Sequence, residues 1–223
     1  MSGTRFSIFK HQLNNKATKE IMKTRKLNSK KALADGMEIR KQHYEKYLGK
    51  LDQPILHPTK KIYPHMNIYQ IAPTPQKPYW TLITNGMSAV KQNIPLDNKR
   101  TSGRTELFMY VVEPQNWMFK LLGGLALTPF AHNNFVHWEH LCCLDDNKIP
   151  KKTGIAHVLY MPPFFEDISF GNTLYINGDK VDPLWIIPIT EPEFEQCLEK
   201  NGDREIAKKL MQAEHPRLFD TIS

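Results

Sequence analysis

The strongest constraint on the fold is a run of apolar residues near the middle of the chain. Every position after Glu106 in the segment Glu106–Val112 (ELFMYVV) is apolar. A strand with one solvent-facing side alternates apolar and polar residues, whereas a strand that is covered on both sides is apolar throughout. A second run, Leu184–Ile189 (LWIIPI), has the same character. These two runs predict buried strands of a central sheet.

Other segments have the composition of strands and turns. Residues Thr173–Val181 contain Asn177-Gly178, a pair that accepts the positive φ angles of a type I′ turn, so a β-hairpin is expected there. Asn85-Gly86 ends another aromatic and β-branched run. The further strands predicted on this basis are Asn67–Thr74, Trp80–Thr84 and Gly154–Pro162.

Four segments have helical features. Apolar residues recur at helical spacing in Gly36–Lys50 and in Asn116–Phe130, and Pro129 is expected to follow the last turn of the second helix. Thr190 and Glu193 have the spacing of a capping box, which predicts a helix start after the strand Leu184–Ile189. A final helix is expected at Asp203–Ala213.

The mixed order of six or seven strands and four helices predicts an α+β fold. We expect one domain at residues 36–223, with a mixed central β-sheet packed by helices. Hydrophobic residues make up 40% of the chain, enough for a substantial core. Residues 1–35 are polar and rich in Lys and Asn, and we expect a basic N-terminal extension that is helical or flexible.

The positive charge of the chain is concentrated at its N-terminal end. Residues 1–50 hold 13 Lys and Arg and 4 Asp and Glu, a net charge of +9, which leaves the remainder at −2. Nucleic-acid-binding domains carry basic surfaces that neutralise phosphates. The main domain is therefore not expected to bind nucleic acid, whereas a docking role or a nucleic-acid-binding role of the extension stays open.

Compartment signals point to the cytoplasm. The first residues lack the apolar core and cleavage site of a signal peptide, and no run of 18 uncharged apolar residues predicts a membrane span. Three cysteines, two of them adjacent at Cys142 and Cys143, do not form a disulfide set. A reducing, cytoplasmic location away from membranes is expected.

The order of several short motifs resembles the Suppressor of fused (SUFU) family. The similarity covers about residues 38–218, and it is the order and spacing of the motifs that carry the resemblance. They are HYEKYLG (His43–Gly49), IYPHMNIYQIAPT (Ile62–Thr74), PYWTLITNGMS (Pro78–Ser88), RTELFMYV (Arg104–Val111) and IIPITEPEFE (Ile186–Glu195).

The resemblance implies a non-catalytic protein-binding domain without a cofactor. Animal members of the family bind transcription factors of Hedgehog signalling and carry a further C-terminal domain, for which this chain has no room after Ser223. The chain is more similar to the short, stand-alone bacterial members. Many of these are regarded as immunity proteins that neutralise polymorphic toxins, so the partner implied is another protein, plausibly a toxin. A regulatory adaptor or scaffold is the alternative.

Four residues are candidates for the contact with a partner. Trp138 lies in a polar, His-rich segment, and Trp is enriched among the anchors of protein interfaces. His137 beside it matches a frequent His of the family, and its ring is expected to bond to the backbone and to order the loop. Phe164 and Phe165 follow Pro162-Pro163, and they either face a partner or fold back over the edge of the sheet.

The segment from His132 to Cys143 is also the densest group of potential metal ligands. His132, His137 and His140 precede Cys142 and Cys143, and Asp145 and Asp146 follow. These spacings match no common zinc site, and an activated Cys142 would need a base and an orienting group that the sequence does not indicate. A metal-dependent enzyme is therefore the least favoured interpretation, and no catalytic or metal-binding residue is predicted.

Overall fold

A mixed β-sheet organises the described part of the chain. The computed structural model describes residues 33–51, 64–95, 97–98, 101–138, 140–144, 150, 153–199 and 202–220. Most of the predicted extension lies outside these residues, so the domain boundary at residues 35 and 36 stays a prediction. Within the described ranges, no helix has the length and apolar character needed to cross a membrane.

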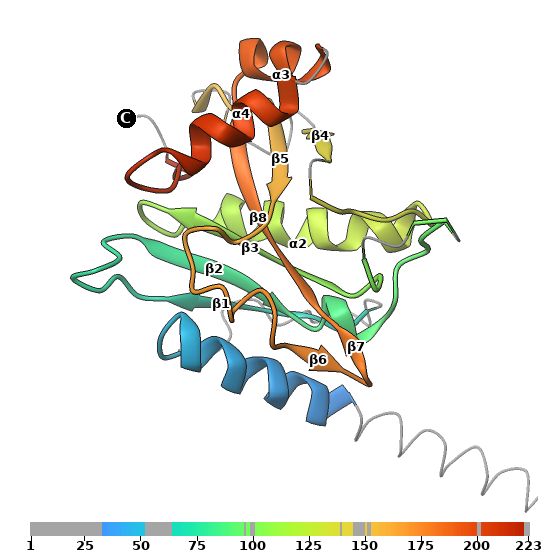
Figure 1. Cartoon of the computed structure of the whole chain (residues 1–223). Helices are drawn as coiled ribbons and strands as arrows, with labels where there is room; N and C mark the ends of the chain where they lie inside the picture. The colour runs from blue at the N-terminus through green and yellow to red at the C-terminus, as the bar shows by residue number, and fades with distance from the viewer. Residues whose placement is uncertain are drawn as a thin grey trace, which may run out of the picture. The chain divides into compact units, whose positions relative to one another are not determined.

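Six strands form the main sheet in the order β1-β2-β3-β8-β5-β4 (Figure 1). Every neighbouring pair is antiparallel except β3 and β8, which run parallel. The prediction of an α+β fold with a mixed sheet is therefore confirmed. The strands are β1 (Asn67–Ile71), β2 (Trp80–Asn85), β3 (Thr105–Val111), β4 (Leu141–Cys143), β5 (His157–Met161) and β8 (Asp182–Ile189).

The two apolar runs form the adjacent central strands β3 and β8. All seven residues of β3 are buried, and β8 is buried from Pro183 onward. Leu107 and Met109 belong to one cluster of buried side chains, whereas Phe108 and Tyr110 belong to another. Because successive side chains of a strand point to opposite faces, the sheet has a core on each side, as the absence of alternation indicates.

Helix α2 (Asn116–Ala131) covers one face of the sheet. Several elements cover the other face: the helix of residues 33–47, the segment that leads into the hairpin of β6 (Tyr175–Ile176) and β7 (Asp179–Lys180), and the C-terminal helices. These C-terminal helices are α3 (Glu191–Leu198) and α4 (Gly202–Met211), which lie together at one end of the sheet (Figure 1).

The local signals at the turn and at the start of α3 are confirmed. Asn177 and Gly178 have φ angles of 53° and 82°, as the predicted turn requires. The backbone N–H of Thr190 donates to the Glu193 carboxylate at 2.9 Å, which is the expected arm of the capping box. Arg217 adds two hydrogen bonds to the same carboxylate, at 2.7 and 2.8 Å, and so joins the C-terminal segment to α3.

The predicted end of α2 is wrong. The helix continues to Ala131 and includes Pro129. The proline removes one N–H from the hydrogen-bond ladder, and two residues of the helix follow it. The hydroxyl of Thr128 donates back to the Gly124 carbonyl at 2.9 Å, the usual i−4 bond of a helical Thr.

Candidate functional site

A cavity of about 450 Å³ lies between three segments of the chain. One wall is the loop between β5 and β6, another is the segment before β4, and the floor comes from β7 and the start of β8. Apolar side chains and carboxylates alternate around it. The lining residues are His137, Trp138, Pro162, Pro163, Phe164, Glu166, Asp167, Ile168, Gly171, Asn172, Lys180, Asp182, Pro183 and Leu184.

Three of the four candidate contact residues line this cavity, because His137 and Trp138 form one wall and Phe164 forms part of another. Phe165 is absent from the lining and packs edge-on against Trp185, with ring centroids 5.5 Å apart. Phe164 packs on the same indole at 5.2 Å. The two phenylalanines therefore fold back onto the core, and only Phe164 also reaches the cavity.

The wall formed by His137 and Trp138 is held by hydrogen bonds, one of them to His140. His137 is buried, its Nδ1 lies 3.2 Å from the Trp138 carbonyl oxygen, and its backbone N–H donates to Nδ1 of His140 at 3.2 Å. Burial lowers the pKa of His140, and nearby His137 adds to this effect. A neutral His140 can accept that N–H bond, so this wall presents the half-buried Trp138 in a fixed position.

A buried carboxylate supports the opposite wall. The hydroxyl of Tyr110 donates to Oε1 of Glu166 at 2.6 Å, and the ammonium of Lys77 forms an ion pair with Oε2. Burial raises the pKa of Tyr110 well above its ordinary value, and the charge of Glu166 adds to this effect. The phenol therefore stays protonated and remains a donor. Strand β3 and the loop between β1 and β2 thus both hold the loop that carries Phe164.

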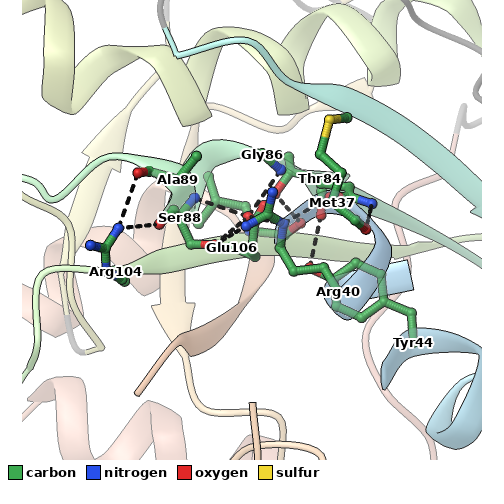
Figure 2. Close-up of polar contacts among 11 residues, drawn as sticks. Met37, Arg40, Tyr44, Thr84, Gly86, Ser88, Ala89, Arg104 and Glu106 are labelled. Atoms are coloured by element: carbon green, nitrogen blue, oxygen red, sulfur yellow. Dashed lines mark hydrogen bonds and ion pairs between the residues drawn. The ribbon is translucent and has the colours of Figure 1, made fainter. Parts of the chain in front are cut away.

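A second buried polar cluster lies at the end of β2 and gives the TNGMS motif its role (Figure 2). Glu106 is fully buried and accepts hydrogen bonds from the Thr84 hydroxyl at 2.6 Å, the Gly86 N–H at 3.0 Å, and the N–H and hydroxyl of Ser88 at 2.9 and 2.7 Å. Arg40, also fully buried, places its Nε 3.3 Å from Glu106.

The same arginine joins the first helix to the sheet. Its Nε donates to the Asn85 side chain at 2.8 Å, and its Nη1 donates to the Ser88 hydroxyl at 3.1 Å. Arg104, at the start of the RTELF motif, donates to the carbonyl oxygens of Ser88 and Ala89 at 2.8 and 3.1 Å (Figure 2). Because these groups bond to one another in a buried site, the cluster joins the first helix to the sheet.

Sequence reasoning gave no role to the polar residues of these clusters. Arg40 lies on the apolar face of its helix, and Glu106 is the single charged residue at the start of an apolar run. Both Arg40 and Glu106 place a charge where the hydrophobic pattern predicts an apolar residue, and this could have indicated a buried ion pair. Lys77, Tyr110 and Glu166 carry no such signal, because they meet only through the pairing of distant segments.

No group of three or more His, Cys, Asp or Glu residues is placed to hold a metal ion, as far as the described residues extend. Cys142 is half-buried and donates to the carbonyl oxygen of Cys143 at 3.4 Å. Asp145 and Asp146 of the possible ligand group lie outside the described residues. The absence of a predicted metal site therefore stays a prediction.

Comparison with known proteins gives a family match over most of the chain. The sequence model described as Suppressor of fused protein (SUFU) matches residues 63–221. No curated protein matches the chain by sequence.

Solved structures share the fold at low sequence identity. A SUFU (suppressor of fused protein) homologue from Neisseria gonorrhoeae has a TM-score of 0.62 at 16% identity, over 85% of this chain and 96% of that one. The Sufu–Fu complex structure has 0.60 at 17%, over 86% and 91%. Drosophila Suppressor of Fused has 0.56 at 15%, over 84% of this chain and 49% of that protein, so the chain matches about half of it.

Proposed function

Since this chain belongs to the Suppressor of fused protein family, we propose that it is a non-enzymatic domain that binds another protein through the surface around the cavity of His137, Trp138 and Phe164. Family membership favours protein binding over catalysis. Family membership does not identify the contact surface, so we infer that surface from the geometry of this chain.

The observation that carries the proposal is the convergence of separate segments on one cavity. Trp138 precedes β4 and Phe164 follows β5, yet both side chains line the same space. Protein interfaces concentrate much of their binding energy in a few residues, with Trp and Tyr enriched, that lie in well-packed pockets from which water is excluded. An aromatic wall beside carboxylates offers apolar contact together with orientation by charge.

A more specific proposal is that the domain is a bacterial, cytoplasmic immunity protein that neutralises a cognate toxin. This proposal is supported by structural similarity: the Neisseria gonorrhoeae homologue has the same fold, and the match covers 85% of this chain and 96% of that one. An adaptor role is the alternative, and the Sufu–Fu structure is an example of this fold in a complex with another protein. Both roles use a protein-binding surface and differ in whether binding abolishes a toxic activity.

The immunity proposal predicts that a neighbouring gene encodes the toxin, and co-expression with that toxin domain tests both the binding and the immunity role. The intact chain should restore growth and bind the purified toxin domain, measured by calorimetry. Trp138→Ala with Phe164→Ala should raise the Kd at least about tenfold, in line with the loss of interface anchors. The control variant Leu198→Ala also truncates an apolar side chain, but on the exposed surface of α3, and it should leave the Kd within about twofold.

Two outcomes would count against the proposal. Binding without protection would reject the immunity role and leave the adaptor role. If binding were retained in the Trp138 and Phe164 double variant, the cavity would not be the contact surface.

A further inference from the structure

The loop between β5 and β6 exposes a large apolar side chain at the rim of the cavity. Ile168 is 79% exposed, more than any other large hydrophobic residue in the described part of the chain. A single exposed apolar residue on a protein surface is ordinary. What distinguishes Ile168 is the number of contacts that hold the loop on both sides of it.

Contacts before and after Ile168 fix the backbone of this loop. On the N-terminal side, Glu166 is held by Tyr110 and Lys77. On the C-terminal side, Nε2 of His43 lies 2.9 Å from the carbonyl oxygen of Phe170, whose ring is fully buried.

Smaller hydrogen bonds complete the arrangement. The Asn172 side chain donates to the carbonyl oxygen of Ile168 at 2.9 Å, so the backbone of the exposed residue itself is held. The Ser169 N–H donates to the Asp167 carboxylate at 2.7 Å, and the Tyr47 hydroxyl lies 3.3 Å from that of Thr173. The loop therefore presents Ile168 from a backbone that is already ordered.

Pre-ordering matters for binding because each flexible side chain or loop that becomes fixed on association costs free energy. An apolar residue on a fixed loop avoids part of that cost. Leu198 provides a contrast within the same chain: it is 67% exposed but lies at the last position of α3, away from the cavity lining.

The charges beside Ile168 indicate the chemistry of the partner. Asp167 is exposed, and its hydrogen bonds from Ser169, with a smaller contribution from the charge of Lys46, keep its pKa below the ordinary value. Asp182 lines the cavity, 3.7 Å from the ammonium of Lys180. Three carboxylates and one ammonium thus line the cavity, and Glu166 is neutralised from behind by Lys77. A basic residue of the partner would complement Asp167.

We propose that Ile168 is the main apolar anchor of the partner-binding surface, and that Glu166 is the positioning residue that holds its loop. The partner is a protein that offers an apolar pocket to Ile168 and a Lys or Arg side chain to Asp167. This inference rests on the proposed function and adds to it the residue that enters the partner.

Site-specific photo-crosslinking in cells separates this inference from the proposed function. The photoreactive residue p-benzoylphenylalanine is placed at Ile168, or at the exposed control positions Leu198 and Met211 on α3 and α4. Ile168 should give one covalent adduct with the toxin domain, identified by mass spectrometry, and the controls should give none. An adduct only at a control position would overturn the inference and leave protein binding intact. No adduct at Ile168, while the intact chain still binds the purified toxin domain, would likewise overturn the inference, whereas no binding by the intact chain would reject the proposed function itself.

Affinity measurements with the purified toxin domain test the anchor. Ile168→Asp should raise the Kd at least about tenfold, whereas Leu198→Asp should change it less than about twofold. Asp167→Lys should slow association, most strongly at low salt, because it replaces an attractive charge with a repulsive one. An unchanged Kd in Ile168→Asp would overturn the inference even if Trp138 proved essential.

The role of Glu166 has its own readout. Tyr110→Phe removes the hydrogen bond to Glu166 without removing volume, and Glu166→Ala removes the carboxylate. Both should raise the dissociation rate about threefold to tenfold and speed amide exchange at residues 163–173. Glu166→Gln, which can still accept from Tyr110, should restore most of the wild-type rate. If exchange rose evenly across the sheet as well, Glu166 would support the fold in general and not the loop.

Discussion

At the scale of single residues, the chain uses buried charge to join elements. Glu106 and Arg40 are both fully buried, and Glu106 accepts four hydrogen bonds besides its contact with Arg40. A buried ion pair is weak evidence of net stabilisation, because desolvation offsets most of the attraction. Removing one partner is strongly destabilising, because the other charge is then left buried and unpaired.

Arg40→Met should therefore lower the free energy of unfolding by about 3–5 kcal/mol. The substitution leaves the Glu106 charge buried and removes the hydrogen bonds of Arg40 to Asn85 and Ser88, so that Asn85 holds the helix of residues 33–47 only through the Met37 carbonyl oxygen. Denaturant titration monitored by circular dichroism measures the change. Gln42→Ala, on the exposed side of the same helix, should stay within about 0.5 kcal/mol of wild type. A loss below about 1 kcal/mol for Arg40→Met would show that the pair does not hold the helix.

At the scale of elements, two Gly turns that look alike in sequence differ in structure. Both follow an Asn, at Asn85-Gly86 and at Asn177-Gly178. Gly178 has a φ of 82° with open space around it, whereas Gly86 has a φ of 135° and its backbone faces that of His65. A Cβ at residue 86 would lie 2.3 Å from the His65 carbonyl oxygen. The first turn is thus packed against another segment, and the second is free.

The two Gly→Ala substitutions should separate these situations. Gly178→Ala meets only the strain of a positive φ and should cost about 1 kcal/mol in the free energy of unfolding. Gly86→Ala adds a backbone clash and displaces an N–H bound to Glu106, so its cost should exceed that of Gly178→Ala by at least about 2 kcal/mol. Thermal and denaturant unfolding of both variants gives the comparison, and equal costs would contradict it.

At the scale of the whole molecule, the C-terminal segment closes the fold. Phe219 is fully buried against α2 and the sheet, and its N–H donates to the Tyr110 carbonyl at 2.9 Å. It forms a bridge to Val111, beside the end of β3 that pairs with β2 but no longer with β8. The described core clusters run from Tyr44 to Phe219, so both cores are built within the predicted domain.

Truncation at the two ends of the chain should have different effects on the free energy of unfolding. A chain without residues 1–32 should keep its circular dichroism spectrum and its free energy of unfolding within about 0.5 kcal/mol, as the predicted independence of the extension requires. A chain that ends before Phe219 should lose about 3–5 kcal/mol, the usual cost of removing a buried Phe. A large loss on removal of residues 1–32 would contradict the predicted domain boundary.

Local signals in the sequence predicted most elements. The strands, the hairpin turn and the capping box depend on residues close in the chain, so their patterns survive in the sequence. The expectation that Pro129 follows the last turn of α2 was wrong, because packing of the helix on the sheet extends it two residues past the proline, to Ala131. Strand β4, only three residues of mixed burial, has no pattern that marks it as a strand.

The sequence by itself determined the fold class, the family and the presence of strands covered on both faces. The tertiary structure alone decided that Glu106 pairs with Arg40, that Glu166 meets Tyr110 and Lys77, and that Trp138 and Phe164 line one cavity beside Ile168. The physical reason is the range of the interactions. Hydrophobic periodicity and turn preferences act between neighbours in the chain, whereas a binding surface depends on which distant segments the strand order brings together.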